Sequence, residues 1–387
     1  MQFIDLAYQQ TRIRKQLEAN LLEVLDHGHY IMGPEIAKLE NLLADFVGAK
    51  HAVSCASGTD ALLMALMAYG AGPGDAVFTT PFTFIATAEV IQLTGATPVF
   101  VYIDPVTFNI DPAKLLTAIR ALNARDASIH PLPAGFRNLR PKAVITVDLF
   151  GLPADYAAIN PLAEREGLVV IEDAAQSFGA QYHGKRACSL AAVGCTSFFP
   201  AKPLGGYGDG GMCFADDDSL AEVLRSIRVH GKGLDKYDNI RIGINGRLDT
   251  LQAAVLLAKF SIFHEEISLR QKVAALYNQF ITEKTNFTAP PIPMDSTSIW
   301  AQYSILAVDG SHRSRALHAL QKAGIPANVY YPKPLHLQTA FANSGYGPGD
   351  FPISEDVSGR IFSLPMHPYL AAADQEKITG VLSGVEA

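Results

Sequence analysis

The sequence is poor in cysteine and in charged residues for a chain of 387 residues. Its four cysteines form no Cys-x-x-Cys pair, so we expect reduced cytoplasmic thiols rather than a zinc site or a disulfide framework. A net charge of -7 argues against a general nucleic-acid or membrane-surface binder. The first residues lack a basic stretch followed by an apolar one, and no apolar run reaches membrane-spanning length. We therefore expect no secretory signal and no membrane span.

What the sequence does contain is enough apolar residues, 49% of the chain, to bury a large core. Helical periodicity predicts two N-terminal amphipathic helices, one that ends at Gly28 and one between Pro34 and Gly48. Short apolar runs then alternate with helical segments, which is typical of βαβ units and a mainly parallel sheet. The predicted strands are 76–80, 97–103, 142–149 and 168–173, and the helices 59–69, 85–93, 113–122 and 155–165.

The second half of the chain changes character. Two short runs, 195–199 and 211–215, are predicted to be neighbouring strands joined by a glycine-rich turn, and a long helix begins at 247 and continues toward 284. We place the domain boundary near residue 255, which gives a large domain 1–255 and a small α+β domain 256–387. The small domain is predicted to contain strands 301–308 and 327–331 and helices 313–323 and 374–382. Residues 124–140, rich in Pro, Arg and Asn, are predicted to form a surface excursion.

One lysine, Lys202, stands in the glycine-rich turn between the predicted strands 195–199 and 211–215. Five of the seven residues from 205 to 211 are glycine. Glycine lets the backbone approach a bound group closely, and a fixed turn aims the lysine side chain. The alternative is an exposed hairpin lysine, because glycine-rich turns are common.

Two other segments carry groups that suit a phosphorylated cofactor. Asp173 ends a predicted strand at the sheet edge where ligands bind, and a carboxylate there can pair with a protonated ring nitrogen. Ser57 and Thr59 open an apolar helix, whose free N–H groups suit a phosphate. Each has an ordinary alternative, because Asp, Ser and Thr often serve only as helix caps.

Other motifs fail. Residues 179–185 nearly match a P-loop, but Arg186 replaces the Ser or Thr that would bind magnesium, and no Gly-x-Gly-x-x-Gly follows a first strand. His230, His336 and His367 are isolated and lack metal-ligand spacing, so no metal is expected.

Taken together, the phosphate-cup helix, the strand-ending aspartate and the lysine segment resemble the DegT/DnrJ/EryC1/StrS sugar aminotransferases, which are fold-type-I enzymes dependent on pyridoxal 5'-phosphate (PLP). The lysine segment, residues 197–211, reads Ser-Phe-Phe-x-x-Lys-x-Leu-Gly-Gly-x-Gly-Asp-Gly-Gly. The likeness runs from Phe3 to Pro368. It implies an α/β fold with a large PLP-binding domain, whose mainly parallel sheet lies between helices, and a smaller C-terminal α+β domain.

The resemblance also implies a role for each matching residue. Lys202 would bond covalently to PLP and act as general acid and base, and Asp173 would pair with the pyridine nitrogen. The other matches are Gln176 near the ring hydroxyl, Phe84 stacked on the ring, Gly58, Thr59 and Ser197 around the phosphate, and Asn245 with Arg247 reaching across a homodimer interface.

Within the family, segments 246–254, 269–275 and 363–370 are most similar to the UDP-2-acetamido-2-deoxy-3-oxo-hexuronate 3-aminotransferases of lipopolysaccharide O-antigen synthesis. This implies glutamate as amino donor and a UDP-linked keto-sugar as acceptor. Arg247, Tyr330, Tyr331 and Lys333 are candidates to bind the anionic sugar, although 330–336 is alternatively only a connecting loop. The sequence departs from the family in the 124–140 insertion, in Tyr330 for the usual histidine, and in Asp148 where histidine or serine is frequent.

Alternative functions remain open. The enzyme could aminate a 4-keto-6-deoxy nucleotide sugar, or it could be a PLP sugar dehydratase, although dehydratases of the family replace the lysine with histidine. A PLP lyase or desulfurase would need a further reactive group such as a mobile-loop cysteine. A catalytically inactive regulator of this fold would more readily have lost Lys202 or Asp173.

Overall fold

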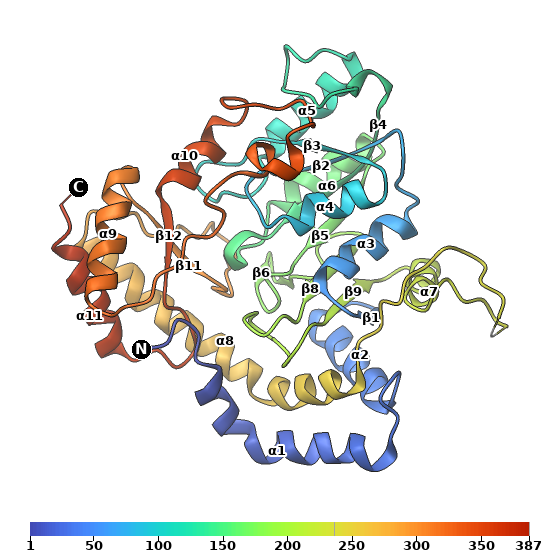
Figure 1. The fold of residues 1–387 in the computed structure, drawn as a ribbon, viewed down its shortest axis with the longest axis horizontal. Helices are drawn as coiled ribbons and strands as arrows, with labels where there is room; N and C mark the ends of the chain where they lie inside the picture. Colours follow the sequence, from blue (N-terminus) through green and yellow to red (C-terminus); the bar gives the residue numbers. More distant parts are fainter. Residues whose placement is uncertain (236, 387) are drawn as a thin grey trace.

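A seven-stranded sheet forms the centre of the larger part of the protein in the computed structural model, which describes residues 1–235 and 237–386 (Figure 1). The strand order is β1-β9-β8-β5-β4-β2-β3. Strands β3, β2, β4, β5 and β8 pair in parallel, whereas β9 is antiparallel to both β8 and β1. The bounds are β1 His51–Cys55, β2 Asp75–Thr79, β3 Thr97–Phe100, β4 Arg140–Val147, β5 Val169–Asp173, β8 Val193–Ser197 and β9 Gly211–Ala215. The mainly parallel sheet is confirmed.

Helices cover both faces of this sheet. Helices α3 (Gly58–Ala68), α4 (Ala86–Leu93) and α7 (Asp218–Ile227) pack on one face, and α5 (Pro112–Ala124) and α6 (Tyr156–Arg165) pack on the other. Successive side chains of a strand point to opposite faces. In β4, therefore, Val144 is buried beside α5 and α6, whereas Ile145 is buried beside α3 and α4. Apolar runs buried on both sides are what the sequence predicted for these strands.

A single long helix, α8 (Thr250–Lys284), joins the large sheet to a smaller unit. Its first half packs against α1 (Leu6–His27) and α2 (Pro34–Val47), and its second half packs against α11 (Ala372–Ser383) (Figure 1). The smaller unit also contains α9 (Gly310–Lys322), α10 (Pro352–Arg360) and the antiparallel strands β11 (Tyr303–Leu306) and β12 (Ile361–Leu364). A third sheet orders β10 (Ser296–Thr297), β6 (Gln181–Tyr182) and β7 (Lys185–Arg186). Residue 255 lies inside α8, and a domain division there stays a prediction.

The strand predicted at 327–331 is wrong. Asn328 makes only an isolated bridge to Ser363, and β12 pairs with β11 instead. Tyr331 has a φ of 58°, in the left-handed region, which ends the extended backbone. Strands β1 and β12 and helices α7 and α10 were not predicted as such.

The 124–140 excursion is only partly on the surface. Residues 125–129 are exposed, but His130 and Leu132 are buried. The His130 Nε2 lies 2.8 Å from the Phe100 carbonyl, and the Ala134 N–H donates to the Ser344 carbonyl at 2.7 Å. The excursion therefore packs against a segment two hundred residues further along the chain.

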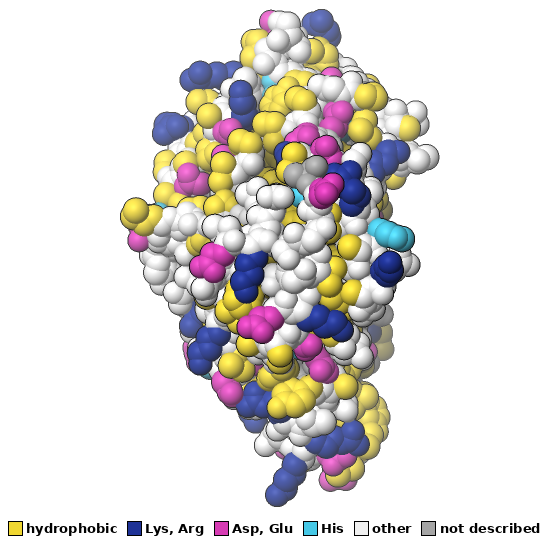
Figure 2. All heavy atoms as spheres, turned by 90° about the vertical axis from the view of Figure 1, so that its left-hand side faces the viewer, with side chains coloured by type: hydrophobic (Ala, Val, Ile, Leu, Met, Phe, Trp, Pro, Cys, Tyr) yellow, Lys and Arg dark blue, Asp and Glu magenta, His cyan; other side chains and the backbone are white. Residues whose placement is uncertain are grey.

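None of the described helices is both long and apolar enough to cross a bilayer. Figure 2 shows the face formed by the smaller unit, where α9 and α11 lie. Basic and acidic side chains are interspersed over this face with apolar ones, so neither sign of charge dominates it.

Candidate active site

A cavity of about 470 Å³ opens at the carboxyl ends of β5 and β8, beside the first turn of α3. In open α/β sheets this edge is where ligands bind. The large sheet, the N-terminal segment and the smaller unit all contribute side chains. They are Ile4, Ser57, Gly58, Thr59, Leu62, Thr83, Phe84, Ala86, Asp173, Ala175, Gln176, Ser197, Phe199, Ala201, Lys202, Asp209, Gln302, Tyr330 and Tyr331.

Lys202 extends into this cavity from a closed turn. The Lys202 N–H donates to the Phe199 carbonyl at 2.9 Å, and Phe198 closes the loop by accepting from Gly206 N and donating to Gly210 O, each at 2.7 Å. Burial lowers the pKa of the Lys202 ammonium, and the nearby Asp173 charge opposes this shift. Among the described residues, none hydrogen-bonds to the Lys202 amine. A desolvated, uncommitted amine is suited to act as a nucleophile.

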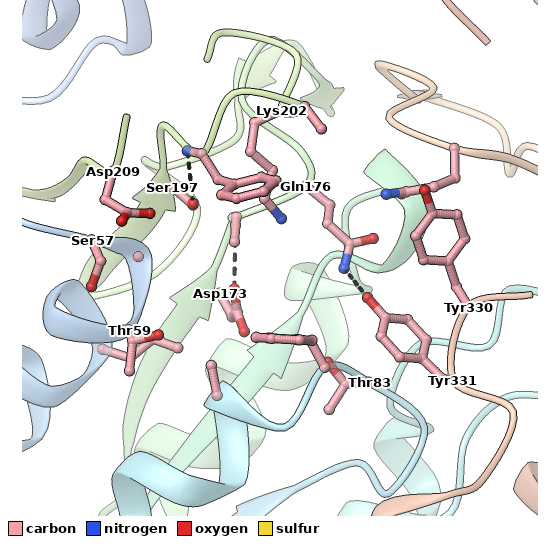
Figure 3. A pocket seen from close by; sticks show the side chains of 18 of the residues that line it. Ser57, Thr59, Thr83, Asp173, Gln176, Ser197, Lys202, Asp209, Tyr330 and Tyr331 are labelled. Carbon is pink, nitrogen blue, oxygen red and sulfur yellow. Dashed lines mark hydrogen bonds between the residues drawn. The ribbon is translucent and has the colours of Figure 1, made fainter. Parts of the chain in front are cut away.

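Asp173 lies opposite Lys202 at the end of β5, and its side chain is 6% exposed (Figure 3). Its carboxylate accepts hydrogen bonds from Thr87 Oγ1 at 2.8 Å and from the Ala175 N–H at 3.2 Å. Burial raises the pKa of Asp173, while these two donors and Lys202 act in the opposite direction. A buried carboxylate with a single nearby cation is well placed to bind a further protonated nitrogen.

One end of the cavity has the composition of an anion cup. Ser57 caps α3 by accepting from the Asp60 N–H at 3.0 Å, and Figure 3 shows Ser57, Thr59, Ser197 and Asp209 gathered around this helix start. Gly58 packs so tightly here that a Cβ on it would lie 2.6 Å from the Cβ of Ser197. Free N–H groups and hydroxyls at a helix N-terminus suit a phosphate. With Asp173 and Lys202 further along the cavity, these residues fit PLP.

The opposite end is formed by Gln176 and two tyrosines. Gln176 Nε2 donates to the Tyr331 hydroxyl at 2.8 Å, and its Oε1 accepts from the Phe150 N–H at 2.8 Å. Tyr330 also lines the cavity and packs against Phe3, with ring centroids 6.4 Å apart. Figure 3 shows both tyrosines at the end away from the anion cup.

Phe84 lines the cavity although 56% of it is exposed, and it follows Thr83 on the segment before α4. An exposed aromatic ring at a cavity wall is available for stacking on a flat ligand.

Three of the sequence candidates lie elsewhere. Asn245 and Arg247 do not line this cavity; Arg247 Nε donates to Asn245 Oδ1 at 2.9 Å in an exposed position. Lys333 is exposed and does not line the cavity either. Among the described residues that line the cavity, Lys202 is the only cation, whereas Asp173 and Asp209 are acidic.

Sequence reasoning did not single out Asp209, Gln302 or Ile4, or the pair formed by Asp148 and Glu172. Asp148 accepts from Ala154 N at 2.9 Å, from Tyr156 Oη at 2.8 Å and from Ser177 Oγ at 2.7 Å. Burial raises the pKa of Asp148 to about 7, and the adjoining Glu172 has a pKa well above its usual value for the same reason. Two carboxyl groups in contact without a cation cannot both be ionised, so the pair shares a proton. Two of these residues had a signal in the sequence: Asp209 stands inside the lysine segment 197–211, and Asp148 departs from the residues frequent in the family.

A sequence profile of the DegT/DnrJ/EryC1/StrS aminotransferase family matches residues 11–383. The chain is 48% identical over 99% of both chains to the UDP-2-acetamido-2-deoxy-3-oxo-D-glucuronate aminotransferase of Pseudomonas aeruginosa. It is 42% identical to a pleiotropic regulatory protein of Geobacillus stearothermophilus, over 97% of this chain and 95% of that protein.

Solved structures are similar over the same length. A DegT DnrJ EryC1 StrS aminotransferase from Brucella abortus has a TM-score of 0.92 and 49% identity, with 99% of each chain covered. NtdA from Bacillus subtilis, solved with bound cofactor PMP, has a TM-score of 0.84 and 26% identity, with 99% of this chain and 83% of that one covered.

Proposed function

This chain belongs to the DegT/DnrJ/EryC1/StrS aminotransferase family and is a PLP-dependent aminotransferase that acts on a nucleotide-linked sugar; from that premise, we propose that it transfers the amino group of glutamate to UDP-2-acetamido-2-deoxy-3-oxo-hexuronate. The product would be a 3-amino sugar for lipopolysaccharide O-antigen synthesis, made in the cytoplasm. The observation that carries the proposal is a buried Lys202–Asp173 pair inside a cavity with an anion cup, in a chain so similar to a 3-oxo-glucuronate aminotransferase.

The residues divide the catalytic work as follows. PLP, when bound, withdraws electrons from the substrate carbon that bears the amino group. Asp173 would keep the ring nitrogen protonated, because its buried carboxylate favours a cationic partner. Lys202 Nζ would take the proton from the substrate carbon and pass it to the C4′ carbon of the cofactor, because its lowered pKa leaves the amine free to act as a base. Ser57, Thr59 and Ser197, which line the cavity at the start of α3, would hold the phosphate.

The acceptor sugar would occupy the end of the cavity lined by Tyr330 and Tyr331. Both tyrosines present hydroxyl groups there, and Tyr331 is fixed by Gln176. The proposed substrate carries a carboxylate and a diphosphate, in addition to the phosphate of PLP. Lys202 alone, the one cation among the described lining residues, cannot balance these charges.

We propose that a second copy of the chain supplies the missing charge as part of a homodimer. Asn245 is exposed and Arg247 is half-buried, and both lie outside their own cavity. Exposed apolar side chains precede them on the same loop before α8, at Ile240 and Ile242. Exposed apolar side chains near a guanidinium whose only hydrogen-bond partner among the described residues is the neutral Asn245 suit an interface that delivers Arg247 to the neighbouring site.

The test is a comparison of acceptors with glutamate as donor, with the product identified by mass spectrometry. We expect the UDP-linked 3-keto-hexuronate to be aminated, and the matching 6-hydroxy sugar to react less efficiently. A charge-assisted hydrogen bond to the carboxylate contributes about 1.5–3 kcal/mol, so the difference in kcat/KM should be about ten- to a hundredfold. Equal efficiency on both sugars, or a preference for a 4-keto-6-deoxy sugar, would contradict the uronate as substrate. It would not contradict the aminotransferase activity.

A further inference from the structure

Helix α8 contacts the loop that carries Lys202 through two side chains that lie two turns apart on the helix. Gln252 Oε1 accepts a hydrogen bond from the Tyr207 N–H at 2.8 Å. Gln252 fits between Gly206 and Gly208, where a Cβ on either residue would come within 2.8 Å of its amide group. Lys259, seven residues further along α8, places its Nζ 5.0 Å from the centroid of the Tyr207 ring. Residues seven apart share one face of a helix, so a single face of α8 holds Tyr207 at two points.

Lys259 is an unusual residue for this position because only 1% of it is exposed. Among the described residues, none forms a hydrogen bond or an ion pair with its Nζ within the usual limits. Burial lowers the pKa of Lys259 to about 8; Arg270 adds to this lowering, while Glu266 opposes it. A buried ammonium costs stability, and an apolar side chain of similar shape often stabilises a protein in its place.

The charged surroundings of Lys259 come from three elements. Glu266 and Arg270 lie on α8 itself, and Arg14 of α1 acts on the Tyr207 hydroxyl. Tyr369, from the segment before α11, hydrogen-bonds to Glu266. Glu266 also accepts from Gln9 of α1 at 2.8 Å, so its charge is already shared between two donors. The Tyr207 ring therefore remains as the partner that the Lys259 ammonium does not share with another described charged side chain.

We propose that Lys259 is a positioning residue for the aminotransferase reaction: its ammonium, held against the Tyr207 ring, works with Gln252 to fix the glycine-rich loop and thereby the direction of Lys202. This rests on the role proposed above for Lys202. A loop with five glycines in seven positions has a large backbone freedom to lose, so it needs anchors outside itself. Its base is fixed by the Phe198 backbone, and Tyr207 is its attachment to α8.

The attraction between an ammonium and an aromatic face disappears when the amine loses its proton. Lys259 should therefore hold the loop below about pH 8 and release it above that pH. Over the same range, proton loss relieves the cost of burying the charge. Stability and the placement of Lys202 should thus respond to pH in opposite directions, which a merely structural lysine would not produce.

The experiment uses the full-length protein loaded with PLP, in four forms: wild type, Lys259→Met, Lys259→Arg and Lys284→Met. Lys284 is the matched control, because it lies on the same helix, with its Nζ 3.9 Å from the Phe280 ring, but is exposed and far along the chain from the loop. Three quantities are measured from pH 6.5 to 9.5: the absorbance of the bound cofactor, the rate at which glutamate changes that absorbance, and the Tm.

We expect the wild type to show a change in absorbance and rate centred near pH 8. Lys259→Met should lose this inflection, react about three- to thirtyfold more slowly at pH 7, and keep or raise its Tm, because a cation–π contact of this kind is worth that factor. Lys259→Arg should keep the rate at pH 7 and lose the inflection, since arginine stays charged. Lys284→Met should match the wild type.

The proposal is overturned if Lys259→Met keeps both the rate and the inflection of the wild type, whatever happens to its Tm. Should Lys259→Met not fold, Lys259→Arg decides: an inflection that persists refutes the proposal and one that vanishes supports it. Failure of the proposed amino donor is recognised separately, because glutamate would then leave the wild-type absorbance unchanged while the pH titration without glutamate still reports on Lys259.

Discussion

Replacing Gly58 with alanine should weaken cofactor binding by about five- to a hundredfold. The added Cβ would lie 2.6 Å from the Cβ of Ser197, whereas carbon atoms in contact stay about 3.5–4.0 Å apart, so α3 and the end of β8 must separate by about 1 Å. Forcing an extra methyl group into a packed site costs about 1–3 kcal/mol. Every 1.4 kcal/mol corresponds to a tenfold change in Kd. The separation opens the cup proposed to hold the phosphate. The substitution should therefore raise the free energy of the PLP-bound protein more than that of the cofactor-free protein.

The assay is a titration of cofactor-free protein with PLP, followed by absorbance, together with the Tm of the cofactor-free forms. Gly380→Ala is the matched control, because Gly380 lies in α11 and a Cβ there meets nothing within 4 Å. This control should bind PLP as the wild type does. A Gly58→Ala protein with the wild-type Kd for PLP would refute the placement of the phosphate between α3 and Ser197.

Three further outcomes are expected. Lys202→Ala should lose the cofactor absorbance band and at least about 10²–10⁴-fold in rate while it stays folded; near wild-type turnover would remove Lys202 from the mechanism. Mixing inactive Lys202→Ala and Arg247→Ala subunits should restore partial activity, since some mixed dimers would hold one intact site, and no recovery after verified exchange would contradict the shared site. The free energy of unfolding should fall as pH rises from about 4 to 7, because folding raises the Asp148 pKa from 3.8 to about 7 and so favours its protonated form; Asp148→Asn should flatten this slope in urea titrations, and an unchanged slope would assign it to other groups.

Local patterns predicted the sheet and most helices because those elements depend on short-range periodicity. The alternation of apolar strands with Ala- and Leu-rich helices matches β2 to β5 and α3 to α6 to within a few residues. β1 was missed because His51–Cys55 is short and runs directly into the turn before α3. The error at 327–331 has a different origin: pairing is limited to the bridge between Asn328 and Ser363, and the left-handed Tyr331 then ends the extended backbone at the cavity.

For the candidate site too, residues in recognisable sequence segments were predicted, whereas contacts between distant residues were not. The segments of Lys202 and Asp173 each have an ordinary alternative when taken alone, but together they resemble one family, and both side chains line the cavity. Contacts between residues far apart in the chain could not be predicted from such segments. The contact between His130 and Phe351, with ring centroids 6.0 Å apart, joins residues more than two hundred positions apart. Lys259 is one of four Lys and Arg residues in α8, and nothing in the local sequence distinguishes it from the others. Long-range contacts leave no local period in the sequence.

The continuity of α8 limits how this enzyme can be divided into fragments. With a rise of 1.5 Å per residue, its 35 residues span about 52 Å and pass from the large sheet to the small one without a break. A fragment ending at residue 255 would lack Phe260 and Phe263, which share one buried apolar cluster with Phe178. Its partner fragment would expose both rings to water. A cut after Lys284, where the helix ends, would instead take Tyr277 and Ile281 away from the core of the smaller unit. The two halves should therefore not fold when expressed separately, wherever along α8 the chain is cut.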